Sequence, residues 1–400
     1  DDFSDLGQHG PGGGTGGTPT LSLTLDATAM SENGGSATGT LTRTGDASAE
    51  LTVTLTSSDT TEASVPATAT FAAGSDTATF TVTAVDDGIA DGTQSVTISA
   101  SDGGLLNANA SIDVTDDEVT ITKIHDIQGT AGTANGDVVG TDDIAAMNGQ
   151  TVTIEAIVTA DFQDGAFGQL GDLNGFYVQE EVTDYDFNDL TSEGIFIYDG
   201  FSPSVDVMTG DLVRITGTVS EFGGTTQINP TSIQVVSSGN LLPDAVDIVF
   251  PVASVQVSSG GYIANLEAYE GMLVNIPQAM ITTEMFNLDR FGEYRISSER
   301  FEQFTQSNDP DTAGYEQHRQ DVARSSIVLD DGLTIQNPSQ VKVIDGNNGI
   351  LETTDTFSMG DTLTDTTGVV SHLFNQFRVL NGTGTYADTN PRQESPEEVG

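Results

Sequence analysis

Short runs in which apolar and polar residues alternate recur along the chain, and this alternation limits its possible folds more than any other feature. The first run is Leu21-Ser22-Leu23-Thr24-Leu25, where every second residue is apolar. Similar runs occupy residues 51–55, 78–82, 96–99 and 112–114. Successive side chains of a β-strand point to opposite faces, so the runs predict strands with one buried face. Turn-forming stretches separate them, and residues 20–118 are therefore predicted to form a two-sheet sandwich.

The composition of the strand-like runs and the length of their connections change from Val119 onwards. The runs become richer in Ile, Phe and Tyr, and the connections between them are longer and rich in Gly and Asp. These runs lie at residues 150–158, 175–179, 194–198, 211–215 and 226–228. About five strands of this kind are typical of a small closed barrel of the OB type. We expect an OB-like barrel over residues 119–240 and a further small, barrel-like β domain over 241–388, which makes the whole chain all-β.

The two ends of the chain read differently from the strands. Residues 1–19 are rich in glycine, which is typical of a flexible leader. Residues 389–400 are expected to be a linker. The chain starts with Asp1 and shows no signal peptide, so we expect a processed segment. No run approaches the roughly 20 apolar residues that span a bilayer, and no membrane partner is expected.

The charge of the chain is strongly one-sided. There are 60 acidic residues and 11 basic residues, which gives a net charge of −49, and there is no cysteine. A chain with this composition fits a secreted bacterial protein, extracellular or on the cell surface. Two interpretations of the charge stay open: a hydrated surface that suits a salty medium, or clustered carboxylates that bind divalent cations. Direct binding to nucleic acid is expected to be weak or bridged by metal, because phosphate contacts need Lys and Arg.

The first predicted domain resembles the Calx-beta domain. The residues that carry the resemblance are Ser31-Glu32-Asn33-Gly34, 79–87, 91–94 and 114–118, in the order and spacing of that family. The resemblance covers the whole segment and implies an immunoglobulin-like sandwich. In some members of the family, calcium lies at one end of it.

Acidic residues follow several of the predicted strands in this segment. The candidate calcium ligands are Glu32, Asp86, Asp87, Asp116 and Asp117, with Glu118 completing the last acidic run. Calcium takes six to eight oxygen ligands, and carboxylates that cluster without a cation repel one another. Calcium is therefore the candidate cofactor. The alternative is that these residues are ordinary turn formers.

The remainder of the chain, residues 121–400, resembles a second family. The likeness begins with Ile124-His125-Asp126-Ile127-Gln128-Gly129 and ends with Asn390-Pro391-Arg392. Between them, the matching segments are 152–159, 175–180, 192–198, 210–213, 217–222, 266–274, 287–294, 329–332 and 368–374. This stretch looks like the OB-like region that precedes the catalytic domain of bacterial extracellular nucleases of the endonuclease/exonuclease/phosphatase superfamily. The resemblance implies that a metal-dependent catalytic domain would follow Gly400 and is absent from these 400 residues.

No catalytic constellation is recognisable in the sequence. The histidines are His9, His125, His318 and His372, which lie in separate blocks without metal-ligand spacing. There is no nucleophile elbow and no phosphate-binding loop. We therefore expect no catalytic or cofactor-binding residue, with His125 a structural hydrogen-bonding residue at the start of the barrel. A metal-dependent hydrolase using Asp330 and Asp331 is a further alternative.

Arginines and aromatic residues are interleaved between residues 290 and 324. The arginines are Arg290, Arg295, Arg300, Arg319 and Arg324. Such a mixture is able to stack on single-stranded nucleic acid, or to pack on a following domain and pair with nearby glutamates. Both readings stay open, with packing favoured because the patch is locally balanced in charge.

Two functions are compatible with these features. The first is a non-catalytic N-terminal region of a secreted bacterial nuclease-like protein. In it, the sandwich is a calcium-stiffened spacer, and the later β domains position the substrate or the protein's own catalytic domain. The second is a subunit of an extracellular filament, sheath or matrix, assembled with neighbouring subunits through β-strand augmentation.

Overall fold

The chain divides into two compact units, Asp1–Thr120 and Ile121–Gly400. The computed structural model describes residues 18–103, 106–130, 138–139, 145, 147–163, 173–257, 259–310, 313–346, 349–352, 355 and 357–390. Most of the expected leader and of the expected terminal linker lies outside the described residues. Among those described, no helix has both the length and the apolar character that a membrane span needs.

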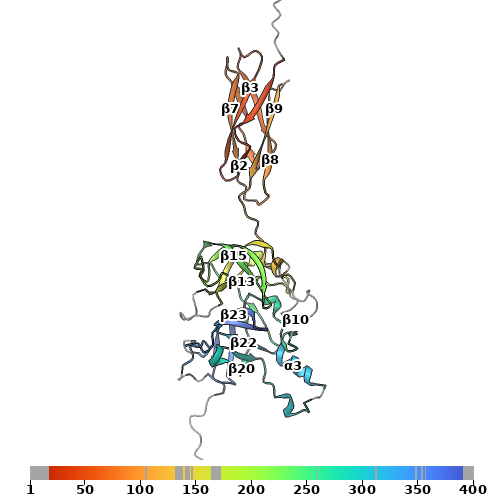
Figure 1. The fold of residues 1–400 in the computed structure, drawn as a ribbon, viewed down its shortest axis with the longest axis vertical. Helices are drawn as coiled ribbons and strands as arrows, with labels where there is room; N and C mark the ends of the chain where they lie inside the picture. Colours follow the sequence, from red (N-terminus) through yellow and green to blue (C-terminus); the bar gives the residue numbers. More distant parts are fainter. Residues whose placement is uncertain are drawn as a thin grey trace, which may run out of the picture. The chain divides into compact units, whose positions relative to one another are not determined.

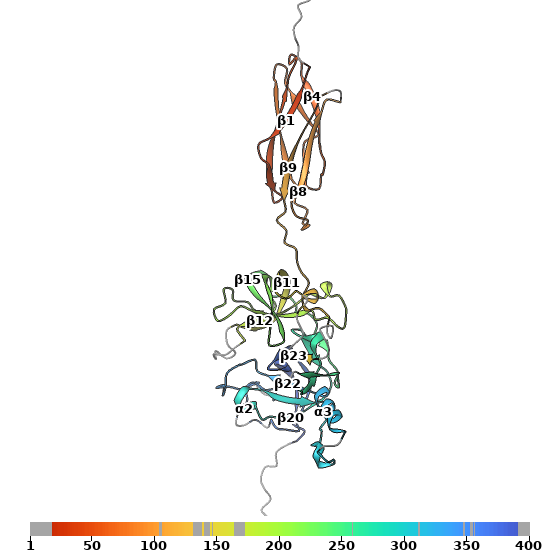
Figure 2. The same cartoon turned by 45° about the vertical axis from the view of Figure 1, so that its right-hand side comes forward.

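Two β-sheets make up the described part of the first unit (Figure 1, Figure 2). Their strand orders are β1-β3-β7-β5 and β2-β9-β8-β4-β6. The strands are β1 (Leu21–Leu25), β2 (Ala29–Ser31), β3 (Ser36–Arg43), β4 (Leu51–Ser57), β5 (Ala63–Ser64), β6 (Thr68–Phe71), β7 (Thr77–Ala84), β8 (Gln94–Ser101) and β9 (Asn107–Thr115). Side chains from both sheets share one apolar core. This is a sandwich, the kind of fold that the Calx-beta resemblance implies.

The alternation of the sequence explains how these strands are placed. In β7, the side chains of Ala78, Phe80, Val82 and Ala84 are buried, and the threonines between them are exposed. Full burial of a side chain such as Val82 stabilises the fold by about 1.5–3 kcal/mol. The threonines suit the exposed face because β-branched residues favour extended backbone. The predicted all-β class is confirmed.

The second unit begins with a short helix, α1 (Ile124–Gln128), followed by a closed five-stranded barrel. The strands are β11 (Thr151–Phe162), β12 (Gly175–Gln179), β13 (Gly194–Tyr198), β14 (Leu212–Phe222) and β15 (Thr225–Ser237). They close in the order β11-β12-β13-β15-β14, and only the β13–β15 pairing is parallel. A five-stranded Greek-key barrel is the OB arrangement. Its core is one cluster of buried aliphatic and aromatic side chains.

A seven-stranded sheet follows, in the order β16-β19-β23-β20-β21-β22-β24. Its strands are β16 (Val246–Asp247), β19 (Leu273–Ile276), β20 (Met280–Glu284), β21 (Tyr294–Ser297), β22 (Ser326–Asp330), β23 (Thr362–Leu373) and β24 (Gln376–Ala387). An additional β23–β24 pairing closes five of them into a ring, β20-β21-β22-β24-β23, with β22 and β24 parallel. This ring repeats the strand order and the one parallel pairing of the barrel. The second unit therefore contains two rings of the same topology.

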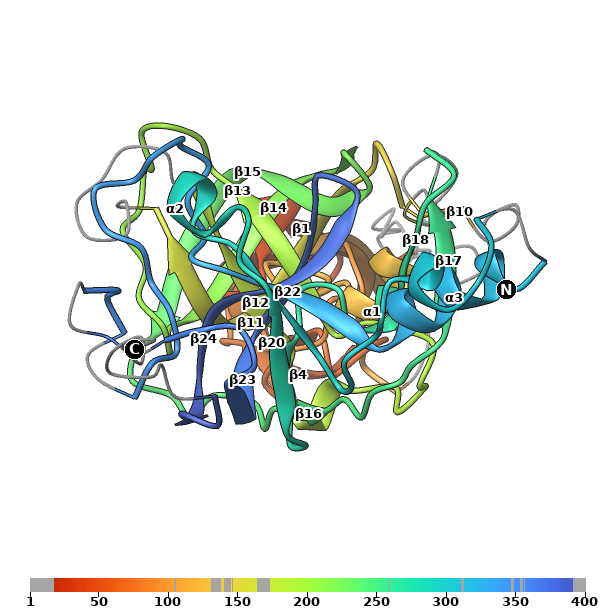
Figure 3. The same cartoon turned by 90° about the horizontal axis from the view of Figure 1, so that it is seen from below.

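Smaller elements lie beside the second ring. A three-stranded sheet joins β10 (Val138–Val139), β17 (Ser254–Val257) and β18 (Tyr262–Ala264). The helix α3 (Tyr315–Arg324) contacts β17, β18 and β22, and Figure 3 shows it next to β17 and β18. The α-helix α2 (Leu288–Phe291) is a single turn, and the described residues also include the 3-10 helices Val182–Asp184, Glu267–Tyr269 and Phe304–Gln306. No helix was expected in the sequence at α3.

The barrel and the second ring pack directly on each other. Tyr177 of β12 and Phe196 of β13 form a buried cluster with Val369 of β23 and Leu380 of β24. The Tyr177 hydroxyl lies 2.7 Å from the Oγ of Ser371, within hydrogen-bond distance. The other faces of β12 and β13 point into the barrel core, so every residue of β12 is buried. Burial on both faces explains why these two strands read as continuous apolar runs.

Candidate metal centre

Strand pairing brings several acidic segments to one end of the sandwich. β2 and β9 run parallel with Ser31 opposite Thr115, so the residues that follow the two strands emerge together. β5 pairs antiparallel with β7, and the amide of Val85 donates to the carbonyl of Glu62 at 2.8 Å. Acidic segments separated in the sequence therefore meet at the end where β2, β7 and β9 finish. We call this end the acidic end of the sandwich.

Three carboxylates at the acidic end converge on a common point. Glu32, Asp86 and Glu118 each offer an oxygen that lies within 4.8 Å of the other two. Calcium binds its ligands at 2.3–2.6 Å, so two ligands on opposite sides of one ion are about 5 Å apart. Glu32 is only 2% exposed, and the Oε2 atom of Glu118 is buried without a hydrogen-bond partner. These three side chains fit a shared calcium ion, with room for water and further oxygens.

The other predicted ligands hold the loops around this point. Asp116 accepts from the amide of Gly92 at 2.6 Å and from that of Glu118 at 2.9 Å. The Oδ2 atom of Asp117 accepts from the side-chain amide of Asn33 at 2.9 Å. Asp117 and Asp116 thus shape the segment that carries Glu118.

Asp87, like Asp116 and Asp117, makes hydrogen bonds that shape its own loop. Its own carboxylate accepts from the amide of Ile89 at 2.9 Å, and its backbone amide donates to Glu32 at 3.0 Å. Of the five predicted ligands, the structure brings Glu32 and Asp86 together, and Glu118 completes the group. Glu118 belongs to the acidic run 116–118, in which no sequence feature distinguishes it as a ligand from Asp116 or Asp117.

Electrostatic repulsion is not balanced at the acidic end. Arg43 is the only Lys or Arg in residues 18–120, and it lies at the far end of β3. Its guanidinium donates to backbone carbonyls there instead of to a carboxylate. Burial raises the pKa of Glu118, with further increases from Asp116 and Glu32. Burial also raises the pKa of Glu62, followed by the effects of Asp91 and Asp87.

The raised pKa values of Glu62 and Glu118 predict a pH dependence for the metal-free sandwich. A group with a raised folded-state pKa stabilises the fold below its unfolded pKa, and this stability is lost as the pH rises through the folded value. The pKa of Asp116 is lowered, mainly by the Gly92 amide, and its effect is confined to pH below its usual value of 3.8. With a chelator present, we expect the amides within residues 20–118 to be better protected near about pH 5 than near about pH 8, when each exchange rate is divided by the intrinsic rate at the same pH.

The substitution Glu118→Gln should flatten this profile, because it removes one of the two titrating groups. The matched variant Glu50→Gln changes an exposed glutamate outside the acidic end and should leave the profile as it is. A sandwich that becomes more stable between these pH values, or that keeps the same profile in Glu118→Gln, would contradict this account of its electrostatics.

The five arginines of the arginine-rich segment are spread over α2, β21, α3 and the connections between them, and three of them form ion pairs with acidic neighbours. Ion pairs join Arg295 to Glu284 at 3.3 Å and Arg319 to Glu316 at 2.9 Å. Arg319 also lies over the ring of Tyr262, 5.3 Å from its centroid. These contacts use charge that a phosphate would need, which favours the packing interpretation.

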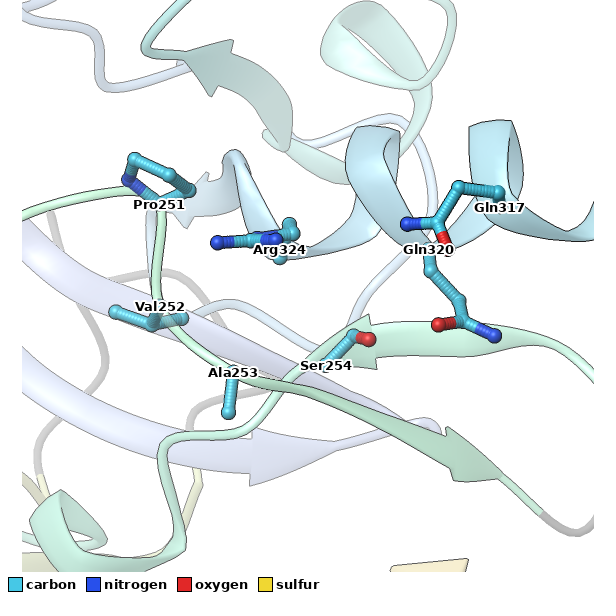
Figure 4. A pocket seen from close by; sticks show the side chains of 7 residues that line it. All are labelled: Pro251, Val252, Ala253, Ser254, Gln317, Gln320 and Arg324. Atoms are coloured by element: carbon cyan, nitrogen blue, oxygen red, sulfur yellow. The ribbon is translucent and has the colours of Figure 1, made fainter.

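A cavity of about 440 Å³ opens between the last turns of α3 and residues 251–254. Figure 4 shows Arg324 and Gln320 from the helix facing Pro251 and Ser254 across it. Arg324 is within 3.8 Å of Asp321 on the same helix. The cavity is small and polar, and it brings together no nucleophile with a base.

Asp330 and Asp331, the acidic pair considered for a metal-dependent hydrolase, both interact with neighbouring groups. Asp330 ends β22, is buried, and pairs with the buried guanidinium of Arg378. The Oδ1 atom of Asp331 accepts from the amide of Leu333 at 3.0 Å, so the pair forms a turn around Gly332. The geometry therefore favours a structural part for Asp330 and Asp331.

Comparison with known proteins gives little beyond the fold. A family described as "Domain of unknown function (DUF8508)" matches residues 262–390. No curated protein matches the chain. Among solved structures, the apo-form Calx CBD1 domain is 19% identical, covers 24% of this chain and 98% of its own, and has a TM-score of 0.20. CBD12 from CALX1.2 is 15% identical, with 53% and 83% covered and a TM-score of 0.22. The YadV chaperone is 11% identical, with 51% and 96% covered and a TM-score of 0.19.

Proposed function

We propose that this chain is a non-catalytic part of a secreted bacterial nuclease-like protein. In this proposal, the sandwich is a spacer that calcium stiffens. The two rings of the second unit position the substrate or a catalytic domain. The observation that carries the proposal is the convergence of Glu32, Asp86 and Glu118 at the acidic end. The nuclease part rests on the resemblance of residues 121–400 to the region that precedes such catalytic domains.

Calcium fits the acidic end better than other common cations. All three converging ligands are carboxylate oxygens, which hard cations prefer. Magnesium requires a near-ideal octahedron with ligands near 2.1 Å and gives up its water reluctantly, whereas the three carboxylates here sit on three separate segments. Calcium tolerates such irregular geometry, and water and backbone carbonyls complete its shell.

The position of Glu118 connects the metal to stiffness. Glu118 follows β9 and comes two residues before the unit boundary at Thr120. Glu32 follows β2, and Asp86 follows β7. An ion held by all three would fasten the chain where it leaves the sandwich to the ends of two other strands. The segment 116–120 then loses conformational freedom.

The second unit supports positioning better than direct reading of nucleic acid. OB folds that bind oligonucleotides use the face of their second and third strands. In the barrel these are β12 and β13, whose outward side chains Tyr177 and Phe196 are buried against the second ring. The alternative of assembly through a leader strand depends on residues 1–17, which lie outside the described part of the chain.

Limited proteolysis tests the stiffening directly. We expect cleavage after Glu118 by a glutamyl endopeptidase to slow at least about fivefold when calcium replaces chelator, because an ordered, liganded backbone is a poor substrate. Cleavage after the exposed Glu50 in the same molecule is the internal control and should not change.

The variant Asp86→Asn should lose the calcium effect, while Asp76→Asn at the opposite end of β7 should keep it. Equal cleavage after Glu118 with and without calcium would overturn the spacer proposal. Hydrolysis of DNA by the purified chain above a blank would overturn its non-catalytic part.

A further inference from the structure

A second group of metal-ligating side chains lies in the other unit, at one end of the barrel. We call it the His125 cluster. It consists of His125, Glu180, Asp186 and Glu193. His125 lies in α1, Glu180 directly follows β12, and Glu193 directly precedes β13. Asp186 belongs to the connection between the two strands. The amide of Glu180 donates to the carbonyl of Glu193 at 3.0 Å, which extends the strand pairing and holds their side chains together.

The imidazole of His125 faces two carboxylates at once. Its Nδ1 atom lies 3.0 Å from Oε2 of Glu193 and 3.3 Å from Oε2 of Glu180. His125, Asp186 and Glu193 each offer a ligand atom within 4.8 Å of the other two. Ligands at about 2.1 Å from a tetrahedral zinc ion are about 3.4 Å from one another. The two distances from Nδ1 of His125, 3.0 Å to Glu193 and 3.3 Å to Glu180, are close to the edges of such a polyhedron.

Glu180 is the member of the cluster that ordinary hydrogen bonding does not satisfy. It is 1% exposed, and its Oε1 atom accepts from the amide of Ile124 at 2.7 Å. Its Oε2 atom is buried and has no hydrogen-bond partner; the nearest ion-pairing atom is Nδ1 of His125. Burial, followed by the neighbouring Glu193, raises the pKa of Glu180 to about 9. A buried oxygen facing other ligands in this way is costly unless a cation or a proton occupies the point between them.

Asp186 gives the cluster an opening to solvent. It is exposed, and both of its carboxylate oxygens accept from the Thr191 hydroxyl at 3.0 Å. The amide of Asn188 also donates to it at 2.8 Å. Burial raises the pKa of Asp186, but the Asn188 amide, the Thr191 hydroxyl and His125 together lower it, so the net shift is downward. The charged carboxylate of Asp186 therefore lies where the otherwise buried His125 cluster meets solvent.

We propose that the His125 cluster binds one divalent transition-metal ion of the zinc class. The combination of one imidazole nitrogen with carboxylate oxygens is typical of zinc and its neighbours, whereas calcium and magnesium prefer oxygen alone. The bound ion would join α1 to the ends of β12 and β13. The ligands bind such an ion in their deprotonated forms, so uptake of the metal is coupled to release of protons.

The competing arrangement uses the same contacts without a metal. In it, His125 is a structural hydrogen-bonding residue and Glu180 keeps a proton between itself and Glu193. The metal site and the hydrogen-bonded arrangement differ in how the protein responds to zinc. A metal site takes up one equivalent with release of protons, whereas the hydrogen-bonded arrangement gains nothing from zinc.

Calorimetric titration of the full chain with Zn²⁺ separates them. Millimolar calcium is kept in the cell to occupy the acidic end of the sandwich. We expect one zinc ion per chain in addition to any weak surface binding. In two buffers with different ionisation enthalpies, the heats should differ as proton release requires.

Two variants make the assignment specific. His125→Gln should weaken zinc binding at least about tenfold, since loss even of a ligand's supporting partner costs about 10–100-fold. His318→Gln removes a histidine that contacts Phe301 and Phe304 instead and is the matched control. Asp186→Asn changes an exposed ligand and serves as a second test that does not depend on a buried substitution.

Zinc uptake that is the same in wild type, His125→Gln and Asp186→Asn would overturn the proposal, as would no uptake at 1 mM zinc. Asp86→Asn should bind zinc like the wild type. If Asp86→Asn loses the calcium effect but still binds zinc, the acidic end of the sandwich and the His125 cluster are independent sites. Failure of the calcium proposal can then be distinguished from failure of the zinc proposal.

Discussion

Calcium should raise the thermal midpoint of the sandwich unit, and a chelator should lower it again. At a calcium concentration a hundredfold above its dissociation constant, a single site stabilises the folded state by about 2.7 kcal/mol. For a domain of this size, that corresponds to a shift of roughly 10–20 °C. The ion offsets the repulsion among Glu32, Asp86 and Glu118, which no base in residues 18–120 offsets. Differential scanning calorimetry, with amide exchange to assign the transition, measures the effect.

Magnesium and sodium are the controls for this shift. Screening by any cation reduces surface repulsion, so sodium at equal ionic strength should give a much smaller shift than calcium. Magnesium at the same concentration should also give less, because it loses its water reluctantly and demands a near-ideal octahedron. Equal shifts with all three cations would mean that general screening, and not a site, stabilises the acidic end.

Gly194→Ala should strongly destabilise the second unit. A Cβ atom at this position would lie 2.3 Å from the carbonyl carbon of Gly271 and 2.6 Å from the amide of Met272, so the barrel would have to move away from the segment that leads into β19. Their contact also includes the Ser192 hydroxyl, which donates to the Glu270 carbonyl at 2.5 Å. We expect a loss of about 3 kcal/mol in the free energy of unfolding, near the upper range for overpacking. Urea unfolding followed by circular dichroism measures it.

Gly261→Ala is the matched control for Gly194→Ala. Its Cβ atom would meet nothing closer than 3.4 Å, and its backbone is not in the left-handed region. It should change the free energy of unfolding by less than about 1 kcal/mol. If Gly194→Ala were equally mild, the approach of the barrel to the segment that leads into β19 would not be as tight as described.

The sandwich could be predicted from the sequence because each strand carries its own pattern. The alternation of apolar and polar residues in β7 predicts which of its side chains are buried, and the turns that separate the strands contain Gly, Asp and Asn. In the barrel, β12 and β13 could be located as apolar runs. Their double burial could not be predicted, because the surface that covers them belongs to β23 and β24, far along the chain.

The candidate sites were harder to predict because they depend on long-range contacts. Glu180 and His125 meet across 55 positions of sequence, and nothing near either residue marks the other as its partner. Asp116, Asp117 and Glu118 are adjacent carboxylates, and which of them joins the converging group depends on loop hydrogen bonds that engage Asp116 and Asp117 elsewhere. The helix α3 was missed because its polar sequence carries no clear apolar stripe.

Binding of calcium at the acidic end of the sandwich can be measured by calorimetric titration of calcium into the full chain, compared with Glu118→Gln and the control Glu50→Gln. We expect a saturable heat with one tight site in the wild type and in Glu50→Gln, and binding at least about tenfold weaker in Glu118→Gln, as expected on loss of a carboxylate ligand. Absence of a saturable heat at millimolar calcium, or identical binding by all three proteins, would contradict calcium binding at the acidic end.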